Sequence, residues 1–128
     1  MRFLFAAMLV ATLATPLAAQ TFRAEGGITV TPVPGGFSVP DGGGMGARGM
    51  WCAAADYAIR RLGAVGIERL YVAQPYSGRR SPVVFTLDPA DLEPSRVLIP
   101  GFTIRRAGAN LSVGHAMSFC ADFRIINP

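Results

Sequence analysis

The segment GMWCAAADYAIRRLG, residues 49–63, carries the clearest structural signal in this 128-residue sequence. Its apolar residues, from Trp51 to Leu62, recur every three or four positions, which is the period of an amphipathic helix. Asp56 precedes Arg60 by four positions, in the acid-first order that supports a helix. The glycine that closes the segment suits the left-handed residue that ends a helix. The segment therefore predicts a helix with one apolar face.

The residues that follow this helix predict a small sheet. Segments 67–74 and 82–87 are rich in β-branched and aromatic residues, and segment 97–105 has the pattern of a third strand, bent at a Pro-Gly pair. The turns between these segments are too short for parallel crossovers, so we expect mostly antiparallel strands. Residues 107–110 favour a turn. The predicted fold is α+β, with the main helix packed on a sheet of three or four strands.

The last segment, residues 111–126, combines two patterns. Alternation of apolar and polar residues fits a half-buried strand, but the apolar residues also share one helical face, and Ser112 is suited to cap a helix. We favour a short helix over residues 113–122 and keep a strand there as the alternative. Residues 123–126 are then expected as a tail or a final short strand.

The segment before the main helix is rich in glycine and proline. Residues 20–49 predict a flexible lead-in with at most one short hairpin, around Ile28 and Phe37. The glycines of residues 42–46 lack the Lys-Ser or Lys-Thr ending of a phosphate-binding loop, so they favour a linker. We therefore expect residues 50–128 to form a single domain.

The first 19 residues have the pattern of a secretory signal peptide. Arg2 precedes an apolar stretch, and Pro16 and Leu17 are followed by the small residues Ala18 and Ala19, after which a signal peptidase would cut. The apolar stretch is short for a membrane-spanning helix, so we expect no transmembrane segment after cleavage. The predicted location is periplasmic or secreted.

Two cysteines, Cys52 and Cys120, are present in the sequence. An even cysteine count in an exported protein predicts a disulfide, and two cysteines allow one intramolecular pairing. A catalytic thiol activated by His115 is the alternative, although no CxxC redox motif is present. We expect a buried bridge that ties the end of the chain to the main helix.

Three stretches, Trp51–Ala58, Val84–Leu87 and Ser112–Cys120, resemble small exported bacterial proteins that have a WCAA-type helix and a late C-terminal cysteine. The resemblance covers residues 51–120. It implies the same position for the helix and supports the pairing of the cysteines. It carries over no catalytic or binding residue.

All twelve basic side chains are arginine, and the formal net charge is +4. Because the arginines are scattered and the net charge is small, the composition argues against nucleic-acid binding, and codon bias explains the absence of lysine. Arg79 and Arg80 follow a Ser-Gly turn and form a candidate anion-binding loop. A solubilising loop tip is the alternative interpretation.

His115 is the single histidine, so general acid–base chemistry would have to use it. Ser112, Ser118 and Asp122 lie near it in the sequence, but no serine has the surroundings of a nucleophile turn. One histidine and two cysteines do not make an ordinary zinc site. We therefore predict no catalytic residue, no cofactor and no metal.

These features favour a non-catalytic binding or interaction module of the cell envelope, with an envelope or extracellular protein as its partner. A length near 130 residues excludes large enzymes and repeat arrays. Two alternatives remain open. One is a small hydrolase or transferase that uses His115. The other is a binder of anionic polymers that uses Arg79 and Arg80, with Arg105 and Arg106 as further candidates.

Overall fold

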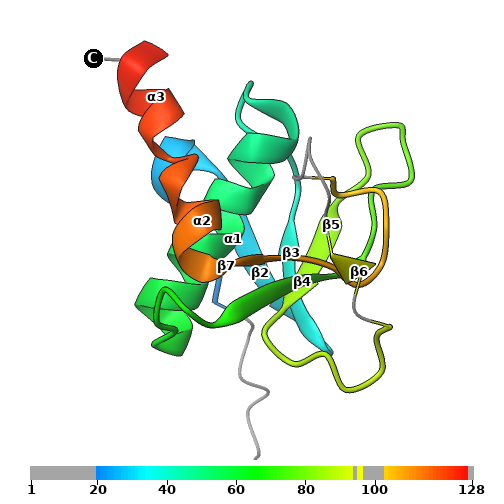
Figure 1. The fold of residues 1–128 in the computed structure, drawn as a ribbon. Coiled ribbons are helices and arrows are strands. Elements are labelled where there is room, and N and C mark those ends of the chain that lie inside the picture. The colour runs from blue at the N-terminus through cyan, green and yellow to red at the C-terminus, as the bar shows by residue number, and fades with distance from the viewer. Residues whose placement is uncertain (1–19, 94, 97–102, 127–128) are drawn as a thin grey trace, which may run out of the picture.

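The computed structural model describes residues 20–93, 95–96 and 103–126. They form one seven-stranded sheet, one long helix and three short helical segments (Figure 1). In chain order the elements are β1 (Phe22–Arg23), η1 (Glu25–Gly27), β2 (Thr29–Val33), β3 (Gly36–Val39), α1 (Gly46–Leu62), β4 (Arg69–Gln74), β5 (Val83–Thr86), β6 (Ser95–Arg96), β7 (Ala109–Ser112), α2 (Val113–Ser118) and α3 (Ala121–Ile126). In this part of the chain no helix is long and apolar enough to span a membrane.

The strands lie in the order β1-β2-β3-β5-β4-β7-β6. Neighbouring strands are antiparallel except for β6, which runs parallel to β7 at one edge. The predicted α+β class and mostly antiparallel sheet are therefore confirmed, but the prediction of three or four strands is wrong. The segment before α1 supplies three of the strands, since β1 pairs with β2, β2 and β3 form the predicted hairpin, and β3 pairs with β5. The short strands β6 and β7 follow β5 in the chain.

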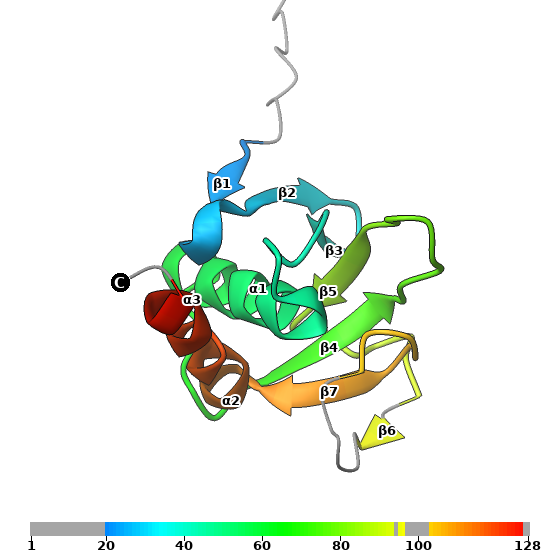
Figure 2. The ribbon, with the colours of Figure 1, turned by 90° about the horizontal axis from the view of Figure 1, so that it is seen from above.

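The sheet curves around α1, and α2 and α3 cover the opposite side of that helix (Figure 2). Residues 49–58 are all buried, so this part of α1 is enclosed around its whole circumference. The prediction of a single apolar face is therefore too narrow, and Leu62, which was assigned to that face, is 49% exposed. Alanines at positions 53–55 suit an enclosed helix because small side chains let neighbouring elements approach closely.

Glycines mark both ends of α1. Gly63 has φ 69° and its N–H donates to the Ala58 carbonyl, which confirms the predicted end of the helix. The helix begins at Gly46, three residues before the predicted start at Gly49 and inside the predicted linker. Inside the helix, Gly49 packs closely on the backbone of Gly42, and a Cβ at Gly49 would overlap the Gly42 carbonyl oxygen.

A chain of aromatic contacts runs through the core from β1 to α1. Phe22 meets Tyr57 edge to face at 5.6 Å between ring centroids, and Tyr57 meets Phe37 at 4.6 Å. Phe37 stacks on Phe85, which meets Trp51 edge to face at 5.0 Å. The sequence placed Trp51 in the core, and the structure confirms it, because Trp51 is fully buried.

Asp56 is a buried carboxylate that joins the N-terminal segment to α1. Its Oδ2 accepts hydrogen bonds from the backbone N–H of Glu25 and from Arg60 Nη2, and its Oδ1 accepts from Arg60 Nε, each at 2.8 Å. The hydrogen bonds and the charge of Asp56 raise the pKa of Arg60 above its ordinary value. The guanidinium of Arg60 therefore stays charged into strongly alkaline pH.

Strand β7 corrects the expected turn at residues 107–110. The turn ends at Gly108, which has φ 83°, and Asn110 already lies within the strand that pairs with β4. The Asn110 side chain donates to the Gly108 carbonyl and accepts from the guanidinium of Arg69, so its turn-forming chemistry is satisfied beside the strand. Of the predicted strand 97–105, residues 97–102 lie outside the described residues and 103–105 form no strand.

The C-terminal segment is helical, in two pieces. The Ser112 hydroxyl accepts from the His115 N–H at 3.1 Å and begins α2, as predicted. The predicted helix over residues 113–122 is broken after Ser118, and the following residues form α3 instead of a tail or strand. Cys120 lies between the two helices and is bonded to Cys52 in α1, which confirms the predicted disulfide.

Candidate ligand-binding site

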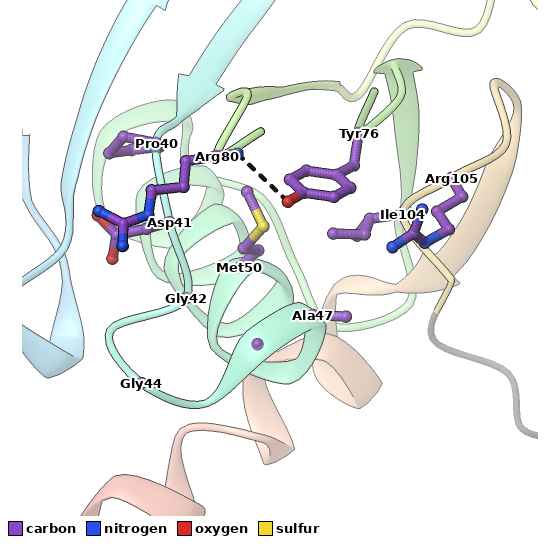
Figure 3. Close-up of a pocket in the computed structure, with 11 residues that line it drawn as sticks. Pro40, Asp41, Gly42, Gly44, Ala47, Met50, Tyr76, Arg80, Ile104 and Arg105 are labelled. Atoms are coloured by element: carbon purple, nitrogen blue, oxygen red, sulfur yellow. Dashed lines mark hydrogen bonds between the residues drawn. The ribbon is translucent and has the colours of Figure 1, made fainter. Parts of the chain in front are cut away.

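A hollow of about 930 Å³ opens beside the N-terminal end of α1 (Figure 3). Three separate segments line it, namely residues between 40 and 50, the β4–β5 loop at Tyr76 and Arg80, and Ile104 with Arg105. Its volume falls within the range of sites that bind small molecules. The hollow is therefore the candidate functional site in the described part of the chain.

Glycines fix the loop that forms the first wall. A Cβ at Gly42 would overlap the carbonyl oxygen of Gly46, and a Cβ at Gly49 would overlap the carbonyl oxygen of Gly42. These contacts hold the loop against the first turn of α1. Gly44, at φ 87°, has no atom within 4 Å of the position where a Cβ would lie, so its backbone is accessible from the hollow.

Tyr76 connects the other two walls. Its backbone N–H donates to the Ile104 carbonyl at 2.7 Å, and its hydroxyl accepts from the backbone N–H of Arg80 at 3.4 Å. The Arg105 guanidinium lies over the Tyr76 ring, 5.1 Å from its centroid, in a cation–π contact. Tyr76 therefore positions both arginines that line the hollow, and together with the buried Met50 and Ile104 it provides an apolar surface.

The backbone of the β4–β5 loop is strained where it presents its arginines. Arg79 and Arg80 have φ of 51° and 56°, in the left-handed region that residues other than glycine seldom occupy. Arg80 lines the hollow, whereas Arg79 does not. Of the predicted anion-binding pair, Arg80 is thus a lining residue, and the second arginine of the hollow is Arg105.

Positive charge exceeds negative charge around the hollow. Arg80 and Asp41 lie on one side and Arg105 on the other (Figure 3). Among the described residues no carboxylate forms an ion pair with either arginine. Gly46 and Ala47 add the N-terminal end of α1, whose first turn has no acidic residue and no side-chain cap.

His115 and its neighbouring serines lie outside the hollow, in and next to α2. Ser112 accepts from the backbone N–H of His115, and Ser118 donates to its backbone carbonyl, so both hydroxyls bond the peptide groups and not the imidazole. Asp122 lies 3.6 Å from the Arg48 guanidinium. The two serine hydroxyls are therefore engaged by the backbone of α2. Within the described residues, no cluster of three or more His, Cys, Asp or Glu could hold a metal.

Sequence reasoning named both arginines of the hollow as candidate anion-binding residues but missed the hollow itself. Met50 was assigned to the helix and the glycines 42–46 to a linker. The signal that was available is the run of glycines directly before a buried helix, because glycine allows close backbone approach. Ile104 and Tyr76 lie far apart in the sequence, and no local sequence pattern predicts the contact between them.

No protein-family model, curated protein or solved structure matches this chain. The interpretation of the hollow therefore depends on its geometry and chemistry.

Proposed function

We propose that this protein is a small, non-catalytic binding domain that acts in the periplasm or outside the cell, with its ligand in the hollow beside α1. The observation that carries the proposal is the convergence of three distant segments on one hollow of about 930 Å³. An apolar surface with a few convergent polar groups is typical of small-molecule sites.

Two features support a location outside the cytoplasm. The N-terminal 19 residues have the pattern of a signal peptide, and Cys52 is bonded to Cys120. Disulfides persist in oxidising compartments and are rare in the cytosol. A ligand presented by an envelope or extracellular partner is consistent with this location.

The surroundings of His115 support binding over catalysis. The imidazole contacts the ring of Phe119 at 5.4 Å between centroids, and the adjacent hydroxyls are engaged with the backbone. General acid–base catalysis by His115 needs the imidazole within reach of the substrate, and His115 does not line the hollow. The His115→Gln variant should therefore bind a ligand in the hollow as the wild type does.

A fragment screen followed by ¹H–¹⁵N NMR spectra tests this function. Fragments of mixed charge should include binders that shift the amides of Ala47, Tyr76 and Ile104, which lie on the three walls. Ala47→Trp should abolish these shifts because the indole fills part of the hollow, and Ala121→Trp, on the exposed start of α3, is the matched control. If no fragment shifts the three amides, or if Ala47→Trp leaves binding unchanged, the proposed site is wrong.

A further inference from the structure

Positive side chains outnumber negative ones in the lining of the hollow, and this excess indicates the charge of the ligand. Two arginines and one aspartate line it, so the side chains leave one net positive charge. The Asp41 carboxylate accepts a hydrogen bond from the Gly43 N–H at 2.7 Å and is tied to its own loop. The positive end of α1 adds to the same potential. An anionic group is therefore favoured in the hollow, and a cation is disfavoured.

The apolar part of the lining defines the rest of the ligand. Met50 and Ile104 are buried, with Tyr76 half-buried between the arginines. Inorganic phosphate would occupy only a small part of about 930 Å³. A ligand that fills the hollow needs an apolar body that covers these three side chains.

Arg80 and Arg105 are held in positions suited to bind an anionic group. Arg105 is held over the Tyr76 ring, and the Arg80 backbone is held by the Tyr76 hydroxyl in a strained left-handed conformation. Strained backbone persists where the surrounding structure enforces it, and such residues cluster at ligand sites. Each guanidinium offers planar N–H donors that match carboxylate or phosphate oxygens.

We propose that the hollow binds an organic anion, with its carboxylate or phosphate group at the guanidinium of Arg80 or of Arg105 and its apolar body against Met50, Tyr76 and Ile104. This inference rests on the proposed function and adds the class of ligand. In each of the pairs Arg79–Arg80 and Arg105–Arg106, one arginine is assigned to ligand binding and its neighbour is not. Arg80 and Arg105 line the hollow, whereas Arg79 and Arg106 do not.

The test is an NMR titration of the oxidised protein with octanoate, octyl phosphate, octanol, octylammonium and inorganic phosphate. Octanoate or octyl phosphate should saturate the shifts of Ala47, Tyr76 and Ile104, and the stronger of the two identifies the head group. Octanol and octylammonium should bind at least about tenfold more weakly, since they lack a charge-assisted partner for the arginines. Inorganic phosphate should bind more weakly than octyl phosphate because it lacks the apolar body.

Two double variants with the same change of net charge provide the matched comparison. Arg80→Gln with Arg105→Gln should weaken binding of the anionic probe about tenfold or more, while Arg79→Gln with Arg106→Gln should change it less than about twofold. If both double variants lose the same affinity for the anionic probe, the net charge of the protein attracts the probe without a specific site, and the inference is wrong. Equal binding of octanol and octanoate would also overturn it, yet leave the proposed function intact. If none of the mixed-charge fragments shifts the three amides, the proposed function and the inference about the ligand are both wrong.

Discussion

Asp56 shows how much one residue contributes to this fold. Its carboxylate is 3% exposed and accepts three hydrogen bonds, one from the segment that carries β1 and two from the helix α1. The partner Arg60 is largely exposed, so solvent screens its charge, but the Glu25 N–H depends on the carboxylate. Asp56 therefore acts mainly as the acceptor that fixes the N-terminal segment on the core.

Substituting Asp56→Asn should lower the free energy of unfolding by about 2 kcal/mol, because the amide replaces one acceptor oxygen with a donor that faces donors. Urea denaturation at neutral pH measures the loss. Glu68→Gln, which changes an exposed carboxylate, is the control and should cost less than about 0.5 kcal/mol. Equal effects of the two substitutions would contradict the role assigned to Asp56.

The contact between Gly49 and Gly42 makes a second prediction. Alanine normally stabilises a helix relative to glycine by about 1 kcal/mol, but at Gly49 its Cβ would overlap the Gly42 carbonyl oxygen. We expect Gly49→Ala to destabilise the protein by about 3 kcal/mol and to weaken fragment binding, since the displaced loop forms a wall of the hollow.

Gly63→Ala is the matched control for that substitution, at the other end of the same helix. No atom lies within 4 Å of its Cβ position, so only the left-handed backbone, φ 69°, opposes the change. Its cost should be about 1 kcal/mol, without an effect on fragment binding. Thermal or urea unfolding of both variants makes the comparison, and a smaller cost for Gly49→Ala than for Gly63→Ala would contradict it.

Among the elements, those with strong local signals could be predicted from the sequence. The end of α1 at Gly63, strand β5 and the cap of α2 by Ser112 follow from helical period, β-branched residues and a hydroxyl at the right position. Strand β7 was missed because Gly108 and Asn110 favour turns locally, while its place in the sheet depends on pairing with β4. The hollow was missed for the same reason, since its walls meet through contacts between distant residues.

The disulfide is the covalent link between α1 and the C-terminal helices. Replacing both Cys52 and Cys120 with alanine should lower the free energy of unfolding by about 4 kcal/mol, because the bridge closes a loop of sequence separation 68. Amide hydrogen exchange should show the largest loss of protection in α2, and a smaller one in β5. An unchanged unfolding midpoint would show that packing alone holds these elements together.

At the scale of the whole molecule, the chain directly after the predicted cleavage site belongs to the core. Phe22 is buried in β1, so the ordered domain needs the chain from close to residue 20 onward. Expressed from its own start codon in a bacterial host, the exported protein should have the intact mass of a chain that begins at Gln20 or within a few residues of it. A mass that still includes residues 1–19 would contradict the signal-peptide prediction.

We propose that the glycine loop, the β4–β5 loop and the Ile104 segment together build one site for an organic anion. The most direct measurement is a crystal structure of the oxidised protein with octanoate or octyl phosphate, whichever binds more tightly. We expect the head group within hydrogen-bond distance of Arg80 or Arg105, and the alkyl chain in contact with Met50 and Tyr76. Ligand density at another surface, with the hollow empty, would contradict it.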